Sequence, residues 1–169
     1  MNQKTEKALN QQIKKEEFSS RLYLAMASWC EANGFPGASV FLYEHSEEER
    51  MHMLKLIHYV NDRGTHAQLL DIEAPKLEYN SLLEIFSEIL VHEKYITDSI
   101  NEIYQVAIDE KDYTTANFLQ WYITEQVEEE SLFSTILDRI KLVGNDKAGM
   151  FHIDKELEGM AAGSSNETA

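Results

Sequence analysis

The sequence predicts an all-α fold, a four-helix bundle with one long crossover connection and a short fifth helix near the C-terminus. Three observations predict this fold. Four long segments carry apolar residues at steps of three and four, the spacing of one helix face. Residues 65–80, between the second and third segments, lack this periodicity. Metal-ligand residue types also interrupt the apolar stripe near the middle of each segment.

The first predicted helix runs from about Thr5 to Asn33, a stretch without proline or glycine. A glycine follows directly, and glycine is favoured just after a helix end. An inward-facing stripe recurs along this segment: Leu9, Ile13, Glu16, Ser20, Tyr23, Ala27 and Cys30. Glu16 thus stands where an apolar residue would be expected. A carboxylate buried there needs a partner, unless helix drift carries it to the surface.

The second predicted helix begins at Pro36 or Gly37 and ends at about Arg63, before another glycine. Its stripe contains Glu49, and His52 follows three residues later. Residues three apart share a helix face, so this pair could bind one cation through a carboxylate oxygen and an imidazole nitrogen. Alone, such a pair more often belongs to a solvated acidic face.

Residues 65–80 predict an extended connection, because they include Pro75 and show no sustained periodicity. At roughly 3.3 Å per residue, such a connection spans about 50 Å when fully extended. That reach would return the chain along a whole helix. The third helix would then start parallel to the second, as in bundles with one long crossover.

The third predicted helix starts after Asn80 or Ser81 and continues to about Lys111. Glu84 follows Ser81 at the spacing of a capping box, which supports this start. Apolar residues recur along the segment at helical spacing. Glu93 is the one charged residue on this stripe.

The fourth predicted helix follows Asp112 and extends to about Val143, before a glycine. Gln126, together with Glu129 or Glu130, interrupts its stripe. After it, a shorter amphipathic stretch from Met150 to Leu157 predicts the fifth helix. We expect one domain over residues 1–158 and a disordered tail over 159–169, which is small and polar.

The polar interruptions repeat at equal spacing in the two halves of the chain. Glu16 precedes Glu49 by the same number of residues as Glu93 precedes Gln126. The first half therefore reads Glu, then Glu-x-x-His, and the second reads Glu, then Gln-x-x-Glu. Four-helix sites that hold two metal ions take one Glu from each of two helices and Glu-x-x-His from each of the others. We therefore predict a dinuclear metal site, in which two cations neutralise the buried carboxylates.

Charge and composition exclude several classes of partner. The formal net charge of −15 over 169 residues disfavours nucleic acid and anionic membrane surfaces, and favours cations. No run of 18 apolar residues is present, and the N-terminal residues lack the apolar core of a signal peptide, so we expect a cytoplasmic protein. The single cysteine, Cys30, excludes an internal disulfide and a four-cysteine metal site.

From about Leu9 to Leu157 the chain resembles the bacterial non-haem ferritins. Four stretches carry the resemblance: Glu16–Tyr23, Glu48–His52, His92–Glu93, and Asn117–Tyr122 leading into Glu125–Glu130. The resemblance implies a ferritin-like bundle assembled as a homo-oligomer, a hollow shell of 24 subunits. Such a shell oxidises ferrous iron with dioxygen or hydrogen peroxide and stores it as a ferric mineral.

The resemblance also implies roles for particular residues. Glu16, Glu49 and His52 would bind the first iron, with Glu49 bridging to the second. Glu93 and Glu129 would bind the second iron. The family pattern places Gln126 beside that second iron, either as a weak neutral ligand or as a residue that orients neighbouring carboxylates.

Two further features follow from the same resemblance. Tyr23 matches a central tyrosine that donates a hydrogen bond or an electron. A third iron site next to the dinuclear centre would take four residues: Glu48, Glu125, Glu128 and Glu129.

The chain departs from two related families. Bacterioferritins have methionine directly after the bridging glutamate, and Arg50 stands there, so we expect no haem. Rubrerythrins add a Cys-x-x-Cys domain, which one cysteine cannot form.

Two other functions stay open at this point, a di-iron enzyme with an organic substrate and a metal-free helical bundle. The substrate-using enzyme would favour a second histidine ligand, where this chain has Gln126 and Glu129.

Overall fold

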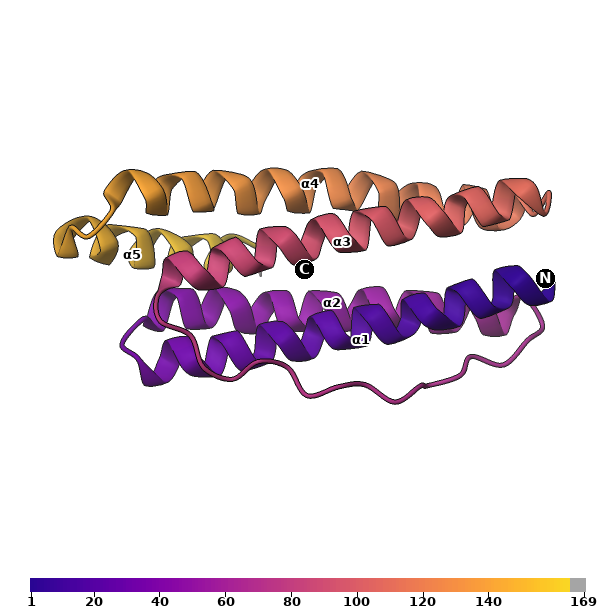
Figure 1. The fold of residues 1–169 in the computed structure, drawn as a ribbon, viewed down its shortest axis with the longest axis horizontal. Coiled ribbons are helices and arrows are strands. Elements are labelled where there is room, and N and C mark those ends of the chain that lie inside the picture. The colour runs from indigo at the N-terminus through magenta and orange to yellow at the C-terminus, as the bar shows by residue number, and fades with distance from the viewer. Residues whose placement is uncertain (165–169) are drawn as a thin grey trace.

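The protein is a bundle of four long helices with a further helix packed at one end (Figure 1). The computed structural model describes residues 1–164, and side chains as far as residue 161. Within that part the helices are α1 (Gln3–Ala32), α2 (Pro36–Asp62), α3 (Leu82–Asp109), α4 (Tyr113–Val143) and α5 (Lys147–Ser164). The predicted all-α four-helix bundle is confirmed.

The connection between α2 and α3 runs along the outside of the bundle from one end to the other (Figure 1). Residues 65–80 contain no helix or strand, as predicted from their lack of periodicity. The connection returns the chain to the end of the bundle at which α2 began, so α3 starts there (Figure 1). None of the described helices combines the length and the apolar character that a bilayer span requires.

At the starts of α1, α3, α4 and α5, the side chain of the residue directly before the helix accepts a hydrogen bond from a backbone amide of the first turn. Ser81 Oγ accepts a hydrogen bond from the Glu84 amide at 3.1 Å, as the predicted capping box requires. The return bond differs from that of a capping box. The Glu84 carboxylate accepts from the backbone amide of Asn80, at 2.7 Å, and not from that of Ser81. Asn2 and Asp112 cap α1 and α4 in the same way.

The apolar core is divided into two clusters by a polar layer. One cluster, near α5, includes Met26, Leu42 and Ile89. The other lies toward the opposite end of the bundle and includes Leu9 and Leu56. Each of the four long helices passes from one cluster to the other through the residues predicted as metal ligands. The layer is thus held on both sides by close-packed apolar side chains.

Helix α5 joins the bundle by capping α2. The Asp154 carboxylate accepts hydrogen bonds from the amides of Gly37, at 3.0 Å, and Ala38, at 2.8 Å. These amides belong to the first turn of α2, where helix geometry leaves backbone donors unpaired and favours negative charge. Gly37 is required there, because a Cβ at this position would lie 1.8 Å from the Asp154 carbonyl oxygen.

Helix α5 is longer than the sequence predicts. It extends past Gly159 to Ser164, into the stretch for which we expect disorder. The reason is apolar contact, because Ala161 is buried and Met160 packs against the same core cluster. The rest of the expected tail, residues 165–169, lies outside the described residues.

Replacing Asp154 by alanine should lower the free energy of unfolding by about 1–2 kcal/mol, because two buried amides lose their acceptor. Urea denaturation followed by far-UV circular dichroism measures this change. Asp138→Ala, at an exposed position on α4, is the control and should have little effect. Equal stability of the two variants would show that the cap contributes nothing.

Candidate metal centre

All four long helices contribute to the polar layer at the centre of the bundle. The six residues predicted as ligands of the dinuclear site are at most 5% exposed: Glu16, Glu49, His52, Glu93, Gln126 and Glu129. Glutamate is almost never buried to this degree without compensation. This burial excludes the alternative that these side chains form a solvated face, and it makes the layer the candidate metal site.

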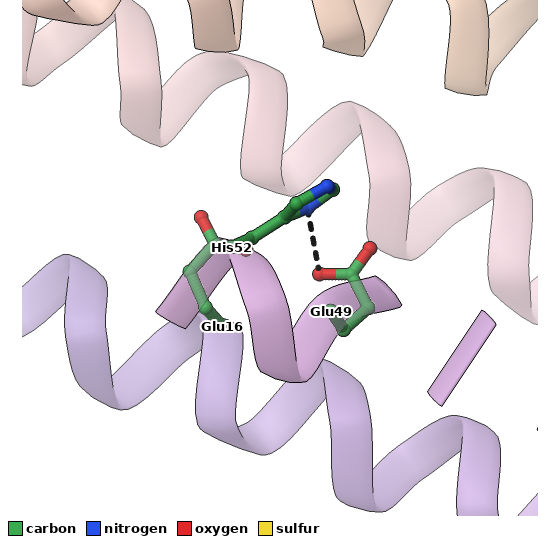
Figure 2. Close-up of side chains that lie close together, drawn as sticks. All are labelled: Glu16, Glu49 and His52. Carbon is green, nitrogen blue, oxygen red and sulfur yellow. Dashed lines mark ion pairs between the residues drawn. The ribbon is translucent and has the colours of Figure 1, made fainter. Parts of the chain in front are cut away.

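Three of these residues form one half of the layer. Glu16 of α1 and Glu49 and His52 of α2 each place a ligand atom within 4.8 Å of the others. Figure 2 shows Glu49 and His52 one turn apart on α2, with His52 Nδ1 3.6 Å from Glu49 Oε2. Two carboxylates and one imidazole at this separation suit Fe²⁺, Mn²⁺ or Zn²⁺.

Hydrogen bonds hold the other half of the layer. The Glu93 carboxylate accepts on both oxygens, from the Tyr23 hydroxyl and from Gln126 Nε2, the latter at 3.0 Å. Gln126 Nε2 also lies 3.2 Å from the Glu93 carbonyl oxygen. The amide of Gln126 thus contacts Glu93 twice. This geometry supports the orienting role for Gln126.

Glu129 differs from the other carboxylates because one of its oxygens has no polar contact. Its Oε2 is buried and has no hydrogen-bond partner among the described residues. Burial, together with repulsion from Glu93, raises the pKa of the Glu129 carboxyl to about 8. An orphaned carboxylate oxygen beside other acidic groups fits a cation ligand.

Burial also raises the pKa of the carboxyls of Glu16, Glu49 and Glu93, since removal from water disfavours the charged form. Repulsion adds to this shift, from Glu49 at Glu16 and from Glu93 at Glu49. The centre therefore retains protons when no cation is present. Cation binding requires the ionised carboxylates and so releases those protons.

The predicted third site is brought together in part. Glu48, His52 and Glu125 each place a ligand atom within 4.8 Å of the others, and so do His45, Glu48 and Glu129. The exposed Glu128 is in none of the ligand groups found among the described residues. His45 is a neighbour that the sequence did not mark as a ligand. Its position on the inward stripe of α2 was the available signal.

An open groove leads from the bundle surface to the polar layer. It lies along α2 and α4, and its lining includes Glu48, His52, Trp121 and Glu125. The volume of about 1260 Å³ admits hydrated cations. Acidic side chains in its lining, Glu48 and Glu125 among them, attract these cations electrostatically. Trp121 lies against His52 with ring centroids 5.2 Å apart, and Lys55 Nζ lies over the Trp121 ring, 4.0 Å from its centroid.

A four-helix bundle with one long crossover and carboxylates at its centre is the architecture of the ferritin-like class of proteins. The chain belongs to the ferritin-like domain family, whose profile matches residues 6–143. The resemblance to the bacterial non-haem ferritins that the sequence indicates is thereby confirmed.

Individual relatives agree with the family. The chain is 50% identical over 151 residues to a probable bacterial non-heme ferritin-like protein of Haemophilus influenzae, covering 89% of this chain and 92% of that one. It is 44% identical over 155 residues to the bacterial non-heme ferritin of Campylobacter jejuni, covering 92% and 93%. Among solved structures it is similar to an open pore ferritin from Archaeoglobus fulgidus, with a TM-score of 0.92 and 40% identity over 94% of this chain and 98% of that one.

The metal-free protein should lose stability as pH rises from about 4.5 to 8. The carboxyl of Glu129 has a pKa of about 8 when folded, against an ordinary value of 4.5. The folded state therefore binds more protons than the unfolded state in this window, and the stabilisation is lost as pH passes through the folded pKa. Urea denaturation between about pH 4.5 and 8.5, with a chelator present, measures this slope.

Glu129→Gln should reduce that slope and raise the free energy of unfolding near pH 8 by about 2–4 kcal/mol, because the uncharged amide has no proton to lose. Glu102→Gln, at an exposed position on α3, is the matched control and should leave the slope unchanged. An unaltered slope in Glu129→Gln would contradict the assignment of the proton to this carboxyl.

Proposed function

We propose that this protein oxidises Fe(II) at the buried polar layer and stores the product as a ferric mineral inside a hollow homo-oligomeric shell in the cytoplasm. The observation that carries this proposal is the burial of four carboxylates and one imidazole between two apolar clusters, at the end of an acidic groove. The non-heme ferritins among its relatives support the same function. Iron is then the substrate and the cargo of the protein.

Unequal binding of the two irons follows from the donors in each half of the layer. Glu16, Glu49 and His52 would hold the first iron through oxygen and nitrogen. The second would depend on carboxylates alone, those of Glu93 and Glu129 with the bridging Glu49, because the amide of Gln126 contacts Glu93. The absence of a nitrogen donor makes the second position the looser one. Loose binding suits storage, because the ferric product has to leave.

The residues of the layer contribute geometry and charge to the oxidation. Their negative charge stabilises ferric over ferrous iron, and electrons pass to dioxygen or hydrogen peroxide. Tyr23 holds Glu93 through its hydroxyl, and its ring is fully buried against Phe133. Burial raises the pKa of the Tyr23 phenol, so this group stays protonated and continues to donate. This position also suits Tyr23 as a source of an electron.

The acidic groups around Glu48 would hold iron between the groove and the dinuclear centre. Glu48 belongs to both of the ligand groups outside the centre, one with His52 and Glu125 and the other with His45 and Glu129. It is exposed, so it meets hydrated cations in the groove. This third position would pass iron inward to the centre or outward to the mineral.

Glu49→Ala should abolish the rapid phase of iron oxidation while the shell still assembles, because Glu49 is the carboxylate shared by both positions. Size-exclusion chromatography, combined with ferric absorbance after aerobic addition of Fe(II), measures both properties. The wild-type protein should elute at a shell mass and oxidise about two irons per chain rapidly. Glu102→Ala is the control and should match the wild type.

Two outcomes would overturn the proposal. An initial rate that is unchanged in Glu49→Ala would remove the layer from the reaction. A small oligomer that binds two metals without oxidising bulk iron would instead indicate a di-iron enzyme with an organic substrate.

Glu125→Gln should lower the number of Fe(II) ions bound anaerobically from about three to about two per chain, because the third position loses a charged ligand. Glu128→Gln is the matched comparison on the same turn of α4, and should keep the wild-type number, since Glu128 lies outside the ligand groups. Isothermal titration calorimetry under anaerobic conditions gives the count. Loss of one iron in Glu128→Gln alone would reassign the third position to Glu128.

A further inference from the structure

A chain of hydrogen bonds runs from the surface of the bundle to the metal centre, across the contact between α1 and α3. Lys15 Nζ donates to Ser99 Oγ at 2.5 Å, and Ser99 Oγ donates to Gln12 Oε1 at 2.5 Å. Gln12 Nε2 then donates to Glu16 Oε1 at 2.7 Å. Lys15, Ser99 and Gln12 are not among the site residues that the sequence predicts.

The direction of this chain is set by chemistry. An ammonium group can only donate, so Lys15 makes Ser99 Oγ an acceptor and leaves the serine hydrogen for Gln12. Gln12 must then present its carbonyl oxygen to Ser99 and its NH₂ group to Glu16. The result is a fixed donor that faces Oε1 of Glu16 on the side of the carboxylate toward α3.

Burial shows that this arrangement is not a surface contact. Gln12 is fully buried, and Ser99 is 3% exposed. Packing alone does not require an amide at this place in the bundle. Gln12 precedes Glu16 by four residues, and the residue four before Glu93 is Ile89, which is also fully buried. The second half of the bundle thus fills the corresponding position with an apolar side chain.

We propose that Gln12, oriented by Ser99 and Lys15, is a positioning residue that holds the Glu16 carboxylate in place for the first iron. It increases the affinity of this position relative to the second, where Tyr23 and Gln126 contact Glu93 instead. Partners of this kind, behind the ligands, typically change metal affinity 10- to 100-fold. This inference rests on the proposed dinuclear site.

The test is anaerobic titration of the metal-free protein with Co²⁺, followed by visible absorption, which reports ligand geometry at each position without turnover. Wild-type protein should bind two Co²⁺ ions per chain at the centre, one of them tightly. In Gln12→Met, which keeps the length of the side chain and removes its polar atoms, the tight position should weaken at least about 10-fold and its absorption bands should shift. The affinity of the second position should stay within about twofold.

Gln11→Met is the matched control, because Gln11 is exposed on the neighbouring position of the same helix. It should bind Co²⁺ as the wild type does. Ser99→Ala should weaken the tight position in the same sense as Gln12→Met, since Gln12 then loses the partner that orients its amide. Ser99→Thr retains a hydroxyl and should restore the affinity. These two variants keep the test valid if Gln12→Met does not fold.

The outcomes separate this inference from the proposed function. If wild-type protein fails to bind two Co²⁺ ions, the dinuclear site itself is wrong. If wild-type protein binds them but Gln12→Met and Ser99→Ala behave like Gln11→Met, the positioning role is wrong. Equal weakening of both positions, together with a lowered melting temperature, would also overturn it, because that pattern indicates general loosening of the bundle.

Discussion

The burial of four carboxylates at the centre of the bundle is the constraint on which the rest of the structure depends. Removing one ionised carboxylate from water costs several kcal/mol even after relaxation, and four in one layer repel each other as well. The metal-free protein meets this cost by keeping protons, as the raised pKa of the Glu129 carboxyl shows. Divalent cations offset this cost more fully, because each carries two positive charges and can neutralise two ionised carboxylates. Affinity for metal is thus a direct consequence of where the helices place these side chains.

Close apolar packing on both sides fixes the positions of the side chains in the polar layer. Leu9, Leu56 and Leu119 belong to one cluster, and Met26 and Phe133 to the other. Helices that pass through both clusters cannot shift without breaking close-packed contacts. Within the layer, the immediate neighbours differ between the two halves. Glu16 meets an amide whose orientation depends on a lysine, whereas Glu93 meets a phenol and a second amide. The two halves of the layer, whose polar residues repeat at equal spacing along the chain, thus differ in the partners that hold their carboxylates.

The fold and the burial of the six candidate ligands could be predicted from sequence because these residues interrupt apolar stripes, a signal that needs only neighbours along one helix. The partners behind the ligands gave no such signal. Gln12 lies beside Ile13 on a helix whose surface is mostly polar, and Ser99 is a small residue far away in sequence. Their connection depends on the register between α1 and α3, which periodicity does not specify. The length of α5 was not predicted for a similar reason. Ala161 is buried only because α5 packs against the bundle, and the local sequence does not indicate this contact.

The cap that Asp154 provides has a consequence for the order in which the subunit matures. The carboxylate and the Gly37 amide that it accepts from are 117 residues apart. At 5–20 residues per second, synthesis of the intervening chain takes on the order of ten seconds. During this time the start of α2 is already outside the ribosome, and the backbone amides of Gly37 and Ala38 can hydrogen-bond only to water. The first hairpin reaches its final form only when the distant helix arrives.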